Sequence, residues 1–181
     1  MKKKIVVNDT NVFIDLFNVG LLEGFFSLPW EVHTTEFVLL ELTREGQRDS
    51  ISQFEDNGLL HIPVFNESAM SNVIELYQQH KNKTNVSLTD CTVWYYAKQN
   101  NYTLLTGDRK LRNASLIDGV EVHGIIYVID QLVKEGILAK RIAISKLKQL
   151  RKSNPRLPMD EIEKRIKQWE KEINEKGGCL L

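Results

Sequence analysis

The feature that most constrains the fold is an alternation of short apolar runs with longer helical patterns along the chain. The first run, residues 4–8, is continuously apolar at its centre, which is typical of a strand buried on both faces. Helical patterns follow, most clearly over residues 66–83 and 87–100. Four further segments have the length and composition of strands, at residues 31–35, 59–64, 103–106 and 120–123. This alternation predicts an α/β fold, a three-layer α/β/α sandwich around a central and mostly parallel sheet.

The last third of the chain has a different pattern. Residues 125–135, 138–152 and 159–175 read as helices, with breaks at Gly136 and at the Asn154-Pro155 pair. We therefore expect a main domain over residues 1–136 and a helical C-terminal extension over residues 137–181. Apolar residues recur at helical spacing in the last helix, so this stripe packs either on the main domain or on a partner.

Composition excludes several classes of protein. A chain of 181 residues suits one domain, and none of its apolar runs reaches the roughly 18 residues that a membrane-spanning helix needs. Lys plus Arg and Asp plus Glu are 24 each, which argues against a generally polycationic nucleic-acid binder but allows a local basic surface. Cys91 and Cys179 are far apart and form neither a disulfide framework nor a zinc spacing. The expected location is a reducing cytoplasm, without membrane attachment.

Two aspartates follow predicted strands directly. Asp9 ends the first strand in KIVVNDTNVFIDL, and Asp108 follows the strand in YTLLTGDRKLRNAS. Each alone has a simple interpretation as a helix N-cap. However, the carboxyl ends of parallel strands meet at one edge of a sheet, where ligands of such folds bind.

Two further acids lie on helices expected to leave the same edge. Glu41 lies in EFVLLEL after the second strand, and Asp90 lies in the first turn of the helix over residues 87–100. Singly, Glu41 fits a solvated helix position and Asp90 a favourable helix-dipole position. Together with Asp9 and Asp108 they would repel one another unless a cation or shared protons relieved the repulsion. Mg²⁺ and Mn²⁺ prefer carboxylate and water oxygens, and ions of this kind support phosphodiester hydrolysis.

The segments DTNVFIDL, EFVLLEL and LTDCTVWYYAKQNNYTLLTGDRKLRNAS resemble, in this order, the successive motifs of PIN-domain proteins. The resemblance covers about residues 4–130. It implies an α/β sandwich with a central parallel sheet and, for many members, metal-dependent ribonuclease activity. The stretches GVEVHGIIYVIDQLVKEGIL and RLPMDEIEKRI resemble a subgroup with a helical C-terminal extension. VapC-like toxins of toxin–antitoxin pairs are a large subgroup of the family.

The resemblance also implies roles for individual residues. It assigns the catalytic and metal-binding roles to Asp9, Glu41, Asp90 and Asp108. Thr106 would orient the loop that carries Asp108, and Asn11 would support Asp9. Asp15, one helical turn after Asn11, is a weaker supporting candidate. An extra acid found in some members shortly after the fourth one has no counterpart here.

Basic residues close to the acids are candidates for binding RNA. Arg109, Lys110 and Arg112 adjoin Asp108 and would hold phosphates, although a solvated helix face accounts for them equally well. A denser basic stretch is amphipathic, and either RNA or an acidic partner segment would fit it. Its basic residues are Lys140, Arg141, Lys146, Lys148, Arg151, Lys152 and Arg156.

The sequence therefore predicts a Mg²⁺- or Mn²⁺-dependent endoribonuclease, as the toxin of a type II toxin–antitoxin pair. The implied partners are an RNA substrate, an antitoxin protein and a second copy in a homodimer. The alternative is a catalytically weak or inactive PIN module that binds RNA or protein. Dehalogenase-like phosphatases need a second Asp where Asn11 stands, and receiver domains need an acidic pair where Asn8 and Asp9 stand, so both fit poorly.

Overall fold

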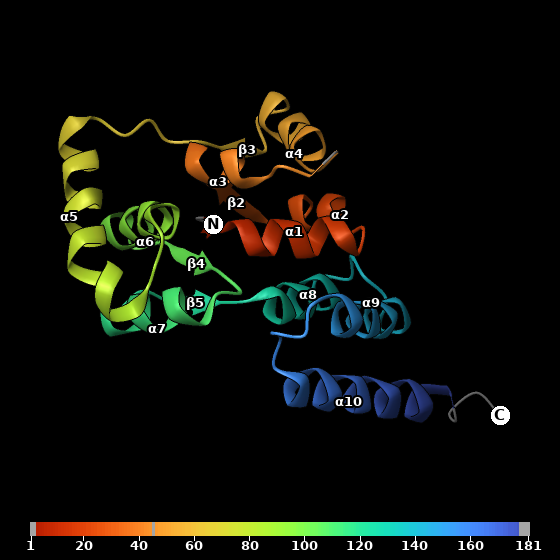
Figure 1. Ribbon diagram of the computed structural model, residues 1–181. Helices are drawn as coiled ribbons and strands as arrows, with labels where there is room; N and C mark the ends of the chain where they lie inside the picture. Colours follow the sequence, from red (N-terminus) through yellow and green to blue (C-terminus); the bar gives the residue numbers. More distant parts are fainter. Residues whose placement is uncertain (1–2, 45, 178–181) are drawn as a thin grey trace.

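A computed structural model describes residues 3–44 and 46–177, and it has one parallel sheet at its centre (Figure 1). The sheet has the strand order β3-β2-β1-β4-β5, and every neighbouring pair is parallel. The chain therefore adds strands on one side of β1 and then crosses to the other side of β1. The strands are β1 (Lys4–Asn8), β2 (Trp30–His33), β3 (Leu60–His61), β4 (Thr103–Leu105) and β5 (Val122–His123).

Helices cover both faces of this sheet. On one face α6 packs on β1 and β4, and α5 and α7 pack beside it; α1, α2 and α8 lie together on the other face (Figure 1). The predicted three-layer α/β/α architecture is confirmed. The helices are α1 (Thr10–Asn18), α2 (Leu22–Phe26), α3 (Glu36–Glu41), α4 (Gln47–Asp56), α5 (Glu67–Thr84), α6 (Leu88–Asn100), α7 (Arg109–Ile117), α8 (Ile125–Lys134), α9 (Lys140–Ser153) and α10 (Met159–Gly177).

The strands are shorter at the sheet edge than the sequence predicts. The central strand β1 is formed as expected, and its Val6 and Val7 are fully buried. The predicted strand over residues 59–64 is wrong beyond His61, because β2 ends opposite that residue and offers no further partner. Pro63 has no N–H to donate to a ladder, and Val64 is 96% exposed.

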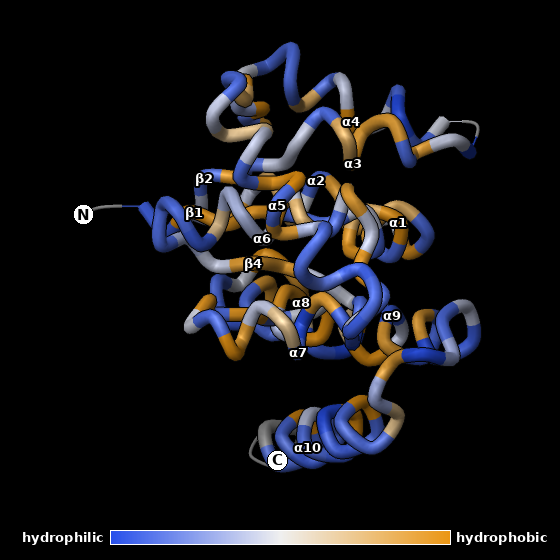
Figure 2. Tube along the Cα trace, turned by 60° about the vertical axis from the view of Figure 1, so that its left-hand side comes forward, coloured by the Kyte–Doolittle hydropathy of each residue, from blue (hydrophilic) through white to orange (hydrophobic). Residues whose placement is uncertain are grey.

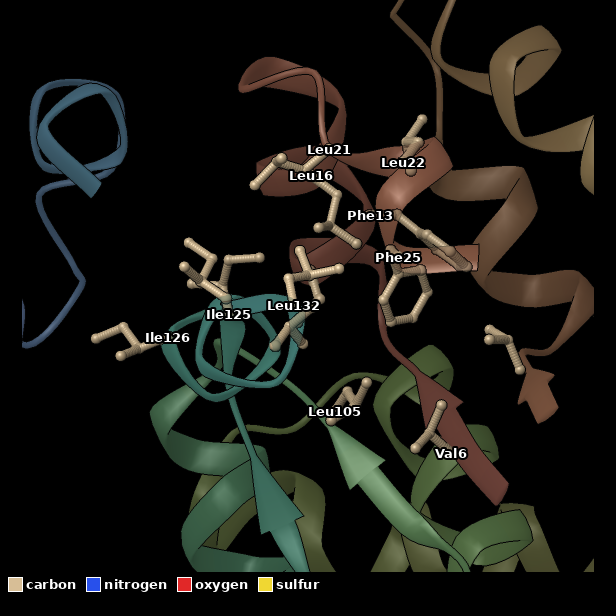
Figure 3. Close-up of a cluster of buried hydrophobic side chains, with 14 of the residues drawn as sticks. Val6, Phe13, Leu16, Leu21, Leu22, Phe25, Leu105, Ile125, Ile126 and Leu132 are labelled. Carbon is tan, nitrogen blue, oxygen red and sulfur yellow. The ribbon is translucent and has the colours of Figure 1, made fainter. Parts of the chain in front are cut away.

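One hydrophobic core joins the sheet to the helices on the α1 side. Figure 3 shows Phe13 and Phe25 on the side of the cluster that Leu132 of α8 also enters, with Leu105 of β4 beneath them. The Phe13 and Phe25 rings meet edge to face, with centroids 6.4 Å apart. Burial on both sides of the sheet explains why its strands read as continuous apolar runs.

The C-terminal helices share this core. Leu147 of α9 is fully buried, and Ile162 and Trp169 of α10 are buried as well. An ion pair of 2.6 Å between Arg165 and Asp130 also joins α10 to α8. Most of α10 is coloured as hydrophilic in Figure 2. Within the described chain none of the helices combines the length and apolar character that crossing a membrane requires.

A buried carboxyl group connects α1 to the turn after α9. Asp15 is 3% exposed, and both of its carboxylate oxygens accept hydrogen bonds from Asn154 Nδ2, at 3.2 and 3.1 Å. Burial raises the pKa of Asp15 from 3.8 to about 6, and the hydrogen bonds from Asn154 offset part of this rise. Asp15, which the family resemblance offered as a weaker supporting candidate, thus has its hydrogen-bond partner in the turn after α9 and fastens the C-terminal helices to α1.

Asp15→Asn is expected to stabilise the protein at pH 7.5 by about 1 kcal/mol. The raised pKa means that the folded state prefers the protonated carboxyl, so the stability that Asp15 contributes is fully present below about pH 4 and is lost as the pH rises through about 6. The full rise in the pKa of Asp15 corresponds to about 3 kcal/mol of stability. The gain from Asp15→Asn is smaller than this, because asparagine keeps only one acceptor for Asn154. Urea unfolding at pH 4 and 7.5 measures the effect, with exposed Glu55→Gln as the control. A variant that is less stable at pH 7.5 would contradict the assignment.

Candidate functional site

Asp9 is a buried carboxylate held by three hydrogen bonds at the carboxyl end of β1. It caps the N-terminus of α1, where its Oδ1 accepts from the Thr10 backbone N–H at 2.7 Å. Its Oδ2 accepts from the Thr106 hydroxyl at 2.7 Å and from Asn11 Nδ2 at 3.1 Å. Burial, and next the charge of Asp90, raise the pKa of Asp9 to about 7, against the effect of these hydrogen bonds. The side chain is therefore firmly placed, and its charged form is disfavoured.

Thr106 connects Asp9 to Asp108 across the neighbouring ends of β1 and β4. Its hydroxyl donates to Asp9 and accepts from the Asp108 backbone N–H at 3.0 Å. Asp108 in turn caps α7, and its Oδ1 accepts from the N–H groups of Lys110 and Leu111 at 2.7 and 2.9 Å. Thr106 thus contacts the Asp108 loop and Asn11 contacts Asp9, while their roles in function stay predictions.

Asp90 lies in the first turn of α6 and forms a capping box with Ser87. Its Oδ2 accepts from the Ser87 backbone N–H at 2.7 Å, while its own N–H donates to the Ser87 hydroxyl at 3.0 Å. Burial raises the pKa of Asp90, and the charges of Asp108 and Glu41 raise it further. The cap holds Asp90 where the charges of Asp108 and Glu41 act on it.

Glu41 is tied to the same edge through Thr10. It is the last residue of α3 and is exposed, and its Oε2 accepts from the Thr10 hydroxyl at 2.7 Å. Thr10 directly follows Asp9, so the hydrogen bond orients Glu41 toward the Asp9 end of β1. Sequence reasoning missed this role for Thr10, because a threonine in a first helical turn is common and carries no signal of its own.

The structure brings the four predicted acids into one electrostatic group around Asp90. Asp9, Asp108 and Glu41 each interact unfavourably with Asp90; burial is the main cause of the raised pKa values of Asp9 and Asp90, and these charges add to it. We call Asp9, Glu41, Asp90 and Asp108 the acidic edge. Such a group is stabilised by a cation, and its all-oxygen donors suit a hard divalent ion.

The acidic edge is not a closed ligand cage. Within residues 3–44 and 46–177, no three His, Cys, Asp or Glu side chains stand close enough to ligate a single ion as they are placed. Mg²⁺ commonly takes only one or two protein carboxylates and keeps several waters. The carboxylates therefore fit a divalent ion in chemistry and charge, with water completing its coordination.

A basic groove runs beside the acidic edge. It has a volume of about 920 Å³ and includes Asn11 and Asp108 in its wall. Its cationic residues are Arg44, Arg109, Lys110 and Arg156. Arg109 and Lys110 thus lie where the sequence predicted RNA contacts, whereas Arg44 and Arg156 were not singled out for this position.

Arg112 faces a different direction from the two basic residues before it. It is half-buried, and its guanidinium donates to the backbone carbonyls of Val122 at 3.2 Å and Thr106 at 3.4 Å. Burial lowers the pKa of Arg112. The predicted set of three RNA-binding residues is therefore divided between the basic groove and a second cavity.

Comparison with known proteins agrees with this geometry. The chain matches the family model described as PIN domain over residues 5–171. No curated protein matches it significantly. Among solved structures it is similar to PAE2754 from Pyrobaculum aerophilum, with a TM-score of 0.51 and 12% identity over 74% of this chain and 99% of that one, which shows a shared fold.

Two solved complexes give weaker matches. VapBC2 from Rickettsia felis, bound to a DNA fragment from its promoter, has a TM-score of 0.46 and 16% identity, covering 66% of this chain and 98% of that one. FitAcB from Neisseria gonorrhoeae has a TM-score of 0.41 and 16% identity, covering 65% and 95%. The family match extends over nearly the whole described chain and includes all four acids and both α9 and most of α10. The chain therefore belongs to the PIN-domain family.

Proposed function

We propose that this protein is a divalent-metal-dependent endoribonuclease. The observation that carries the proposal is the gathering of the four acids around Asp90 at the carboxyl edge of the parallel sheet, where burial, and next the charges of neighbouring acids, raise the pKa values of Asp9 and Asp90. Structural ion pairs lower the pKa of a carboxyl group, so buried acids whose nearest charges are other acids fit a cation-binding site better than a structural network. Membership of the PIN family favours a nuclease.

The residues of the chain have separate tasks in this proposal. Asp9, Glu41, Asp90 and Asp108 would hold Mg²⁺ or Mn²⁺, directly or through water. A bound ion supplies charge neutralisation and Lewis acidity for hydrolysis of the phosphodiester. Thr106 and Asn11 hold the Asp9 carboxylate in place. No protein nucleophile is required.

The basic groove supports RNA as the substrate. Arg109 and Lys110 directly follow Asp108, so phosphates held by their side chains would lie next to the acidic edge. Cationic side chains of this kind hold a nucleic-acid backbone without reading its sequence. The proposed place of action is the cytoplasm, where RNA is present.

A toxin role is the second part of the proposal. It rests on membership of the PIN-domain family, of which VapC-like toxins are a large subgroup. An antitoxin protein would then cover the acidic edge, and the chain would act as a homodimer. The competing proposal is a catalytically inactive PIN module that keeps the basic groove for binding.

RNA cleavage is expected to require an added divalent ion. The purified chain should cleave a fluorescent oligoribonucleotide in Mn²⁺ or Mg²⁺, and excess EDTA should reduce the rate to background. Asp90→Asn should cleave at least about 100-fold more slowly, because even indirect partners of a metal cost 10- to 100-fold. Exposed Glu67→Gln is the control. Equal cleavage with EDTA present, or by the Asp90 variant, would remove the catalytic assignment.

A further inference from the structure

A second cavity adjoins the basic groove and shares Gly107, Arg109 and Arg156 with it. It has a volume of about 440 Å³, within the range of small-ligand sites. The turn between β4 and α7, the start of α8 and the turn between α9 and α10 form its walls. We call it the arginine cavity, after its residues Arg109, Arg112 and Arg156, which surround it together with Ile126, Leu157 and Glu161.

The arginine cavity has an excess of positive charge. Its lining residues include three arginines and one acid, Glu161, and in the described part of the chain no ion pair within 4 Å engages any of the three arginines. Arg112 is held in place by its two bonds to backbone carbonyls, so its position is fixed before any ligand binds. Planar guanidiniums are suited to bidentate recognition of a phosphate, and Arg109 and Arg156 are exposed residues on the wall of the cavity.

The arginine cavity has both charged and apolar lining residues. Gly107 and Arg109, which directly flank Asp108, form the end next to the acidic edge. Ile126 and Leu157 give the other part an apolar surface; Figure 3 shows Ile126 directed away from the Phe13 cluster. A phosphate at the first end and a flat apolar ring at the second is the chemistry of a nucleotide.

We propose that the arginine cavity binds one nucleotide of the RNA strand, next to the phosphodiester that the acidic edge cleaves. The phosphate contacts Arg109 and Arg156, and the base lies on Ile126 and Leu157. This rests on the proposed ribonuclease function and adds a binding site to it. Because Arg156 and Leu157 come from the turn after α9, the C-terminal helices complete the substrate site.

Glu161 gives the cavity a preference among bases. An ionised carboxylate only accepts hydrogen bonds, and its charge also acts on Arg112. Guanine offers two adjacent donors, N1–H and the N2 amino group, that match the two carboxylate oxygens. On the Watson–Crick edge of adenine, cytosine or uracil each donor has an acceptor beside it, so these bases cannot give two adjacent hydrogen bonds to one carboxylate. Guanine is therefore the favoured base.

Binding of mononucleotides without metal tests the proposal independently of cleavage. The full chain is titrated in EDTA with 5′-GMP and 5′-UMP, and binding is followed by NMR shifts of the Gly107 and Gly124 amides. We expect GMP to bind at least fivefold more tightly than UMP. Arg156→Gln should weaken GMP at least tenfold, the usual effect of losing a charge-assisted hydrogen bond. Glu161→Gln should remove the preference for GMP.

A matched arginine variant and a competing peptide serve as controls for this titration. Arg48→Gln, an exposed arginine of α4, should bind GMP like the wild type. Equal binding of GMP by the Arg156 variant, or a penta-aspartate peptide that competes as well as GMP, would overturn the nucleotide assignment; the peptide result would indicate an acidic protein partner. RNA cleavage without GMP binding overturns the cavity assignment alone. GMP binding without cleavage in Mn²⁺ overturns the proposed ribonuclease and leaves the cavity as a nucleotide site.

Discussion

Asp9→Asn is expected to abolish RNA cleavage, by at least about 100-fold, while leaving the fold intact or more stable. The carboxylate belongs to the acidic edge, so its loss should cost no less than the 10- to 100-fold that indirect partners of a metal cost. Asparagine is as good an N-cap as aspartate and keeps an acceptor for the Thr10 N–H. Its amide NH2 cannot accept the hydrogen bonds from Thr106 and Asn11, and we expect the relief of charge burial to offset that loss. Neutralising a buried carboxyl whose pKa is raised to about 7 also relieves its repulsion with Asp90.

Rate and stability have to be measured on the same preparation. Cleavage of an oligoribonucleotide in Mn²⁺ gives the rate, and thermal unfolding at pH 7.5 gives the stability. Exposed Asp160→Asn, in the first turn of α10, is the matched control. Inducible expression extends the test to cells, where growth arrest by the wild type but not by the Asp9 variant would favour the toxin role. If the variant cleaves as fast as the wild type, the inactive-module alternative is favoured.

The opposite signs of the two effects make this experiment informative. A residue that serves only the fold loses stability when it is changed, and activity falls as a consequence. Asp9 is predicted to lose activity while stability holds or rises, which is the behaviour of a site that carries unfavourable charge for a functional reason. A loss of both would mean that the three hydrogen bonds to Asp9 are its main role.

The sheet and the acidic edge were predictable because their signals are local. A continuous apolar run identifies β1, and the polar residue that ends it identifies Asp9. The parallel arrangement then brings Asp108 beside Asp9 without further information, since strand ends share one edge. The extent of β3 was not predictable in this way, because the length of an edge strand depends on where its only neighbour stops.

Contacts between distant segments could not be predicted from the sequence. Asp15 and Asn154 are 139 residues apart, and nothing in either segment indicates the other. Arg156 stood in a basic stretch that fitted RNA or a partner equally well, and only the turn after α9 brings it next to Arg109. Arg112 lies three residues after Arg109, but its guanidinium is bound to backbone carbonyls of other segments. In each of these cases the partner of the side chain depends on the direction in which it points, which the sequence does not give.

Leu147→Ala is expected to destabilise the whole protein by about 2–5 kcal/mol. Leu147 lies on α9, is fully buried and belongs to the same core as the β1 and β4 strands. Removing a buried leucine side chain costs its transfer free energy and leaves a cavity. We propose that the main domain and the C-terminal extension, divided at residues 136–137, unfold together as one unit. Urea unfolding should then show one transition, shifted as a whole, in far-UV circular dichroism and in tryptophan fluorescence.

The control lies on the same helix. Ile142 is 49% exposed, so Ile142→Ala should change the free energy of unfolding by no more than about 0.5 kcal/mol. Two separated transitions for Leu147→Ala, with only the smaller one shifted, would mean that the C-terminal helices fold independently of the sheet. A single shifted transition has a consequence for function as well. The turn that carries Arg156 would then be held in place by the same core that positions Asp9 and Asp108, so destabilising α9 should weaken nucleotide binding and RNA cleavage together.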